Sequence, residues 1–179
     1  MTHKLRTPSG KIEIFSERIA SFGYHDCPGH PIWMNLVEWL GSAKDSQLHL
    51  ISNQPKNKLH SQLDHGRPSQ ADRIGGYEPA LIHPAVASAR GIRQHDIIRV
   101  FNIRGACLCA AVLSENIRTG VIQISTGAWL DIKGDTGLCR QGNPNVLCLD
   151  KGTSKLGQGP IAHSCLVEIE PLGKAYSSQ

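Results

Sequence analysis

The pattern of hydrophobic and polar positions changes near residue 47. Residues 24–46 are rich in Gly, Pro and Trp and show neither the period of a strand nor that of a helix. Beyond them, short apolar runs alternate with turn-forming residues, as in a chain of short strands. The predicted strands are 47–51, 80–83, 96–101, 106–113, 121–125 and 165–170, with an earlier one at 11–15 and one or two helical turns at 16–22.

Two local signals are stronger than the rest. The tetrapeptide 102–105, Asn-Ile-Arg-Gly, predicts a tight turn that joins 96–101 and 106–113 into a hairpin. Pro84 is suited to open a helix through Arg90, and Gly91 to cap its end. Several short strands with one well-marked helix predict a mainly β domain with short helices, closed into a barrel.

Composition narrows the class of partner. At 179 residues the chain is expected to form one domain, and 18 Gly and 10 Pro indicate many turns. Its net charge of +4 is scattered, without a run of Lys or Arg, which favours a phosphate-bearing small molecule over nucleic acid. No apolar stretch approaches a membrane span, so no membrane partner is expected.

Six cysteines occur without any Cys-x-x-Cys pair, so all are expected to be free thiols. Free thiols favour a reducing compartment, the cytoplasm rather than the periplasm. Cys107 and Cys109 should point to the same face of their strand as small hydrophobes. A zinc site formed by His25, Cys27 and His30 with Cys139 is an alternative, but this spacing lacks paired ligands and Pro28-Gly29 explains the window as a turn.

Polar loops supply the candidate binding residues. The loop that leaves the strand at 47–51 carries Asn53, Lys58, His60, Ser61 and Gln62, and the end of a strand is a natural position for a ligand. The alternative is a solvated turn in which Lys58 is merely exposed.

A second polar segment begins at Asn143, which could cap a helical turn opened by Pro144. Either the segment serves only as this cap, or Asn145 also recognises a ligand. The segment 152–158, Gly-Thr-Ser-Lys-Leu-Gly-Gln, lacks the Lys and Ser or Thr that a phosphate loop needs after its second Gly. This departure from the motif argues against a nucleotide triphosphatase.

Several runs together resemble a known family. Residues 82–92 and 96–105 resemble the double-psi barrel signature of molybdopterin dinucleotide-binding domains, and 59–62, 142–147 and 150–156 add further matches in the same order. The opening 7–16 is similar to the lead-in to the last domain of the trimethylamine N-oxide and biotin sulfoxide reductase branch. The resemblance extends over 7–170 and is to the C-terminal domain of the dimethyl sulfoxide reductase family.

This resemblance implies a double-psi β-barrel of the aspartate decarboxylase-like type. It implies a barrel at 46–172, an irregular lead-in at 1–45 that packs on the barrel or on upstream domains, and a flexible tail at 173–179. The chain would be a fragment of an N-oxide or S-oxide reductase, monomeric and inactive by itself, with the upstream domains of the same polypeptide as its partner.

The cofactor implied is molybdopterin guanine dinucleotide, in the bis form with molybdenum in the full enzyme. In the family, dithiolene sulfurs and a side chain of an earlier domain hold the metal, so no catalytic residue or metal ligand is expected here. The loops 53–62 and 143–158 should lie side by side at one end of the barrel. The implied cofactor contacts are Asn53, Lys58, His60, Ser61, Gln62, Asn143, Asn145, Ser154, Lys155 and Gln158. Glu78 and Arg104 also match family positions, but an ion pair and a turn explain them structurally.

Two other functions are compatible with such a barrel. An aspartate decarboxylase needs a self-cleaving Gly-Ser bond, and Gly41-Ser42 precedes the barrel. A protein-recognition module without a cofactor, as in unfoldases, explains the barrel but not the polar loops at 60–62 and 143–145.

Overall fold

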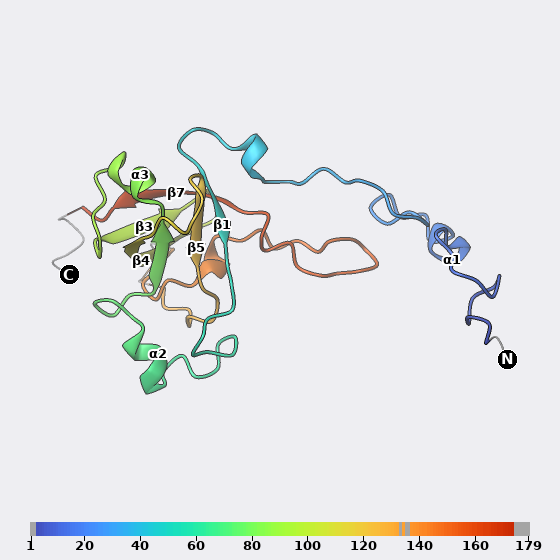
Figure 1. The fold of residues 1–179 in the computed structure, drawn as a ribbon, viewed down its shortest axis with the longest axis horizontal. Helices are drawn as coiled ribbons and strands as arrows, with labels where there is room; N and C mark the ends of the chain where they lie inside the picture. The colour runs from blue at the N-terminus through green and yellow to red at the C-terminus, as the bar shows by residue number, and fades with distance from the viewer. Residues whose placement is uncertain (1–2, 133, 135–136, 174–179) are drawn as a thin grey trace. The chain divides into compact units, whose positions relative to one another are not determined.

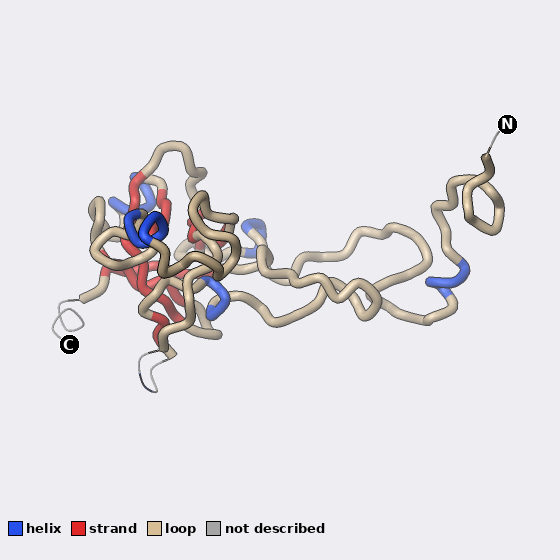
Figure 2. The backbone as a smooth tube through the Cα atoms, turned by 90° about the horizontal axis from the view of Figure 1, so that it is seen from below, coloured by secondary structure: helices blue, strands red, loops and turns tan. Residues whose placement is uncertain are grey.

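The structure is a computed structural model that describes residues 3–132, 134 and 137–173. It divides into two compact units. The lead-in unit comprises Met1–Leu36 and Asp150–Ile161, and the barrel unit comprises Val37–Leu149 and Ala162–Gln179. All strands of the described residues belong to the barrel unit, and loops dominate elsewhere (Figure 2).

The barrel is closed by six strands in the order β2-β5-β1-β7-β3-β4, and β4 pairs back onto β2. Figure 1 labels five strands of this ring: β1, β3, β4, β5 and β7. The pairs β1–β5 and β2–β4 are parallel, whereas the other pairs of the ring are antiparallel. This mixed pairing confirms the predicted mainly β double-psi barrel. The strands are β1 (Leu48–Ile51), β2 (Pro79–Ile82), β3 (Ile97–Phe101), β4 (Ala106–Leu113), β5 (Val121–Ile124), β6 (Leu138–Cys139), which pairs in parallel with β4, and β7 (Leu166–Pro171).

The core fills the barrel with aliphatic side chains. Leu50, Ile82, Ile98 and Ile122 have no exposed surface, and each such burial contributes about 1.5–3 kcal/mol. Residues 106–111 of β4 are all buried because both faces of that strand are covered. Its alternate residues divide between two clusters, with Cys107 and Cys109 in the main core and Ala106 and Leu108 in the second. The two cysteines therefore share one face, as predicted.

The helices are short: α1 (Glu17–Ala20), η1 (Leu40–Ser42), α2 (Arg67–Ala71), α3 (Pro84–Ser88) and η3 (Pro144–Val146). The predicted helix at Pro84 is α3, and the His83 ring accepts a hydrogen bond from the Ala85 N–H at 3.1 Å. Gly91, at φ +67°, ends the turn as predicted. The helices α3 and α2 lie at opposite ends of the barrel (Figure 1). No helix in the described part of the chain is long and apolar enough to cross a membrane.

The strand predicted at 11–15 is wrong. These residues form no strand, and Ile12 and Ile14 are 85% and 79% exposed, because no neighbouring strand offers backbone partners. One short helix, α1, does occur within the predicted 16–22. Trp33 is 82% exposed and covers no core. The expected boundary at residue 45 remains a prediction, and all but residue 173 of the expected tail lies outside the described residues.

Candidate functional site

Two neighbouring parallel strands, β1 and β5, bring polar loops to one end of the barrel. Because β1 and β5 are parallel and paired, the loops that follow them leave at the same edge. Asn53 joins these loops: its carbonyl oxygen accepts a hydrogen bond from the Thr126 N–H at 2.9 Å. Its side-chain oxygen accepts from Gln123 Nε2 at 2.9 Å and Ser125 Oγ at 3.2 Å. Asn53 therefore connects the ends of β1 and β5 through hydrogen bonds.

A pocket of about 420 Å³ opens at this end. Three segments form its walls: the turn after β1, the loop after β5, and the turn η3. Its lining residues are His60, Ser61, Thr126, Gly127, Ala128, Trp129, Leu130, Asn143 and Asn145. The structure thus brings together parts of the two loops that the sequence predicted to lie side by side, although about 80 residues separate them.

One glycine makes the close approach of two walls possible. A Cβ on Gly127 would lie 1.9 Å from the carbonyl oxygen of His60, far inside contact distance. Gly127 also has φ +101°, which side chains disfavour. His60 itself has φ +52°, and such backbone strain is common at functional sites.

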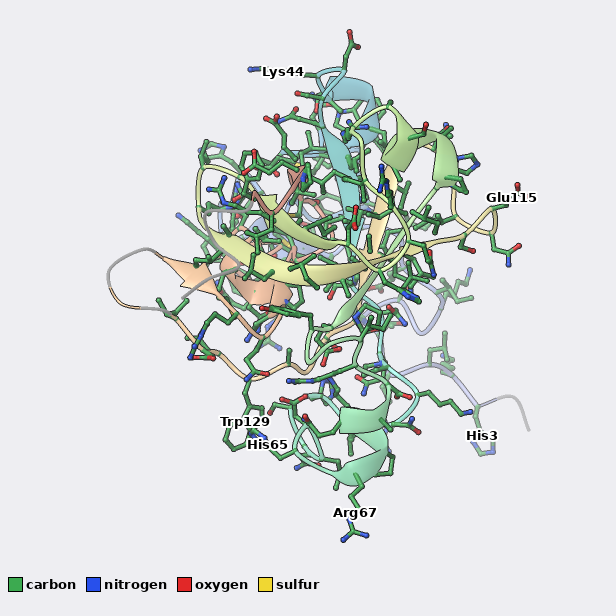
Figure 3. All side chains as sticks on the ribbon, turned by 90° about the vertical axis from the view of Figure 1, so that its left-hand side faces the viewer. His3, Lys44, His65, Arg67, Glu115 and Trp129 are labelled. Atoms are coloured by element: carbon green, nitrogen blue, oxygen red, sulfur yellow. The ribbon has the colours of Figure 1, made fainter. Side chains whose placement is uncertain are left out.

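The His60-Ser61 turn is held by two kinds of contact. Leu59 and Gln62 exchange backbone hydrogen bonds at 3.3 and 3.0 Å across its base. On its other side, the indole nitrogen of Trp129 donates to the Ser61 carbonyl at 2.8 Å. The Trp129 ring meets His65 edge-on at 4.5 Å, and the two lie together beside α2 in Figure 3. The side chains of His60 and Ser61 make no hydrogen bond within the described residues and remain available to a ligand.

The two asparagines of the third wall have different environments. Asn143 is buried, and its side-chain oxygen accepts from the Asn145 N–H at 2.9 Å, which confirms the predicted cap. Asn145 is exposed, and its amide side chain has no hydrogen-bond partner among the described residues. Its free donors and acceptors can therefore serve a ligand.

Below the pocket lies a buried ion cluster formed by Lys58, Asp64, Arg73 and Glu78, whose side chains are each at most 5% exposed. Lys58 pairs with Asp64 at 2.9 Å and with Glu78, and Arg73 pairs with the same two carboxylates at 3.0 and 3.1 Å. Two positive and two negative charges thus balance in a place that water does not reach.

This cluster touches all three pocket walls. Lys58 and Asp64 flank the His60 turn, and Asp64 also accepts a hydrogen bond from the Trp129 N–H at 3.2 Å. Arg73 donates to the side chain of Gln141, just before η3. Burial by itself would raise the pKa of Asp64, but hydrogen bonds from Lys58 and Trp129 and the nearby cations hold that pKa below its usual value.

Lys58 was among the cofactor contacts that the sequence predicted. Its ammonium group is paired with Asp64 and Glu78, so it helps to hold the pocket walls, and its contact with a cofactor remains a prediction. The alternative of an exposed Lys58 is wrong, because its side chain is 3% exposed. The structural role expected for Glu78 is confirmed by its ion pairs.

The remaining predicted residues lie outside the pocket lining. Gln62 is exposed, with a side chain that has no partner in the described chain. Ser154, Lys155 and Gln158 belong to the lead-in unit, where they form a turn. Ser154 Oγ accepts from the Gly157 N–H at 2.8 Å, and Gln158 donates to the Lys155 carbonyl at 3.0 Å. Their contact with a cofactor remains a prediction.

Sequence reasoning missed the wall at 126–130. A signal was present, because Ser125-Thr126-Gly127 leaves a predicted strand just as Asn53 does. What the sequence alone did not reveal was that β5 lies next to β1 and runs parallel to it. The sequence also did not identify Trp129 as a pocket residue, since exposed tryptophans occur in many structural settings.

At the β3–β4 turn, Arg104 forms a bidentate ion pair with Glu38 at 2.6 and 2.9 Å. Glu38 also accepts from the Leu166 N–H at 2.7 Å, so it ties the start of the barrel unit to β7. The Arg104 hydrogen bonds lower the pKa of Glu38, against the opposing effect of partial burial. The structural role expected for Arg104 is confirmed.

We expect Glu38→Gln to lower the free energy of unfolding by about 1–3 kcal/mol at pH 7. A carboxyl whose pKa is lower in the folded state stabilises the fold above its unfolded pKa of about 4.3. That contribution disappears as the pH falls through the lower folded value. Urea unfolding at pH 7 and pH 3 should therefore show a difference between variant and parent that shrinks in acid. An unchanged difference would contradict the ion pair as its source.

The alternative sites find no support. Among the described residues, no three His, Cys, Asp or Glu side chains gather as metal ligands, which leaves the zinc alternative without a site. Gly41-Ser42 lies in η1, where the Ser42 hydroxyl donates to the Trp39 carbonyl at 3.0 Å, outside the barrel strands.

The fold and pocket define a class of protein: a closed β-barrel domain with a polar pocket at the end where β1 and β5 terminate. Comparison with known proteins makes the class specific. The family model described as "Molydopterin dinucleotide binding domain" matches residues 48–166, which include all three pocket walls. The chain belongs to this family.

Relatives of known name are much longer proteins. The chain is 46% identical over 168 residues to biotin sulfoxide reductase of Cereibacter sphaeroides, covering 94% of this chain and 23% of that protein. It is 51% identical over 173 residues to trimethylamine-N-oxide reductase of Salmonella typhi, covering 93% and 20%. It thus spans about a fifth of these relatives. Among solved structures, acetylene hydratase from Pelobacter acetylenicus shares the fold, with a TM-score of 0.74 at 20% identity over 95% of this chain and 24% of that one.

Proposed function

We propose that the pocket holds part of a molybdopterin guanine dinucleotide, in the bis form, within a reductase of N-oxides or S-oxides. Two observations support this. The chain belongs to a dinucleotide-binding family, and relatives at 46% and 51% identity are named for biotin sulfoxide and trimethylamine-N-oxide reduction.

The observation that carries the proposal is the set of unused polar groups on the pocket walls. His60, Ser61 and Asn145 come from two loops distant in sequence, and their side chains have no partner in the described chain. A pterin dinucleotide has polar edges on both ring systems and a diphosphate, all of which need fixed partners. Gly127 leaves the space between these walls that a side chain would fill. The residues present therefore fit the group.

The division of labour follows from these contacts. When bound, the cofactor supplies the redox-active molybdenum. The residues of this chain bind and orient the dinucleotide: the imidazole of His60 and the hydroxyl of Ser61 from one side, and the amide of Asn145 from the other. The buried ion cluster fixes the positions of these pocket walls relative to one another. In this proposal, catalytic groups and substrate contacts come from other parts of the full-length protein, and the isolated chain has no reductase activity.

The lead-in unit supports a second part of the proposal, that residues 1–36 pack on upstream domains of the same polypeptide. Ile12, Ile14 and Trp33 are 79–85% exposed, an arrangement that is costly unless another surface covers them. Limited proteolysis should cut 1–36 readily in this chain alone and slowly in the full-length protein. Equal cleavage in both would count against packing.

The sharpest test of the pocket is Asn145→Ala. In the full-length enzyme we expect it to weaken cofactor retention by about 1–3 kcal/mol, because a ligand hydrogen bond is lost and its partner is stranded. In the chain alone, urea unfolding should be unchanged within about 0.5 kcal/mol, because the side chain is exposed and makes no internal contact.

A matched control is Asn53→Ala. The Asn53 side chain is used internally by Gln123 and Ser125, so its removal should lower stability in the chain itself. Full cofactor retention by Asn145→Ala would reject the proposed contact.

A further inference from the structure

Two cysteines of the barrel unit, Cys148 and Cys165, lie on segments that contact each other next to η3. Cys165 Sγ donates to the carbonyl of Leu147, the residue before Cys148, at 3.2 Å. Cys148 Sγ in turn lies 3.4 Å from the carbonyl of Ala162, three residues before Cys165. These contacts hold the two cysteine-bearing segments together.

Exposure and charge distinguish the two thiols. The neighbouring Cys165 thiol and the positive charge of Arg104 lower the pKa of Cys148, against partial burial and the charge of Glu38. The Arg104 guanidinium lies 3.7 Å from Cys165 Sγ. Cys148 is partly exposed, so a small reagent can reach it, whereas Cys165 is fully buried behind it. A reactive thiol with a second thiol in contact is the arrangement of an attacking and a resolving cysteine.

The other cysteines show how unusual this environment is. Cys107 and Cys109 share one face of β4, but both are fully buried in the core. The neighbouring Cys109 thiol and burial raise the pKa of Cys107, which makes it inert. Cys27 is partly exposed like Cys148, but no thiol contacts it in the described chain. Only Cys148 combines exposure with a neighbouring thiol among the described cysteines.

We propose that Cys148 and Cys165 form an oxidation-sensitive dithiol that a hydroperoxide converts to a disulfide. The Cys148 thiolate attacks a hydrogen peroxide oxygen, so an S–O bond forms, the O–O bond breaks and hydroxide leaves. The Cys165 sulfur then attacks the Cys148 sulfur. The S–S bond forms, the S–O bond of the sulfenic acid breaks, and the hydroxyl group leaves as water together with the Cys165 thiol proton. Overall, two thiols lose two electrons and one hydrogen peroxide becomes two waters.

This modification site adjoins the candidate pocket, but its chemistry does not depend on the proposed function. Cys148 Sγ lies 3.3 Å from the carbonyl of Pro144, the first residue of η3. Any change at Cys148 therefore occurs one contact away from the turn that carries Asn143 and Asn145.

Peptide mapping tests the proposal on the unaltered protein. The native protein is treated with hydrogen peroxide, denatured, alkylated with N-ethylmaleimide and digested with trypsin, which places Cys148 in 141–151 and Cys165 in 156–174. We expect these two peptides to be linked by a disulfide, and the peptide with Cys107 and Cys109 to be fully alkylated. In the native protein, hydrogen peroxide should oxidise Cys148 about tenfold faster than Cys27.

Variants separate the two thiol roles. In Cys165→Ser, Cys148 should stop at the sulfenic acid and be captured by dimedone, whereas Cys27→Ser should leave the 148–165 link intact. Reaction of Cys148 no faster than Cys27, or oxidation of the native protein without the 148–165 link, overturns the proposal.

Discussion

Asp64→Asn is expected to destabilise the barrel by about 3–5 kcal/mol, the usual cost of leaving a buried charge without its partner. The substitution preserves shape but removes one of two carboxylates, so Lys58 and Arg73 share Glu78 alone. One uncompensated positive charge then remains among side chains that are at most 5% exposed. Urea unfolding at pH 7 measures the loss.

Three comparisons make this result specific to the buried ion cluster. Glu170→Gln removes an exposed ion pair with Arg99 and should cost only about 0–1 kcal/mol. Lys58→Met combined with Asp64→Asn removes one charge of each sign and should recover part of the loss. In acid, the parent protonates Asp64 as the pH falls through its lowered pKa, so parent and variant should converge. A cost for Asp64→Asn no larger than that for Glu170→Gln would show that the cluster is not a source of stability.

The barrel was predictable because its strands combine period-two or fully apolar patterns with clear turn signals. The hairpin β3–β4 and the helix α3 have local causes, a Gly-containing turn and a first-turn proline, and both occur as predicted. The two-residue strand β6 has no period to detect. The error at 11–15 has the opposite cause, since an alternating pattern there lacks a partner strand to pair with.

The candidate site was predictable only in part. His60, Ser61 and Asn145 were found because they match family runs in polar loops. The role of Lys58 was missed because its partners Asp64 and Glu78 lie 6 and 20 positions away, in loops whose meeting depends on the closed barrel. Polar residues in a loop do not reveal whether they face a ligand or each other, and burial decides this only after folding.

Gly127→Ala is expected to destabilise the chain by at least about 3 kcal/mol and to block cofactor loading. Positive φ costs about 1–3 kcal/mol for a residue with a side chain, and forcing atoms apart in a packed region adds a similar amount. Here the new Cβ would lie 1.9 Å from the His60 carbonyl oxygen, so the His60 turn and the loop at Gly127 must move apart. Gly76→Ala isolates the first contribution, because Gly76 has φ +87° and open space around its Cβ position. The free energy of unfolding is measured for both variants, and the cofactor content is measured in both full-length enzymes. If Gly127→Ala loses no more stability than Gly76→Ala and retains cofactor equally well, close approach of these two walls does not shape the pocket.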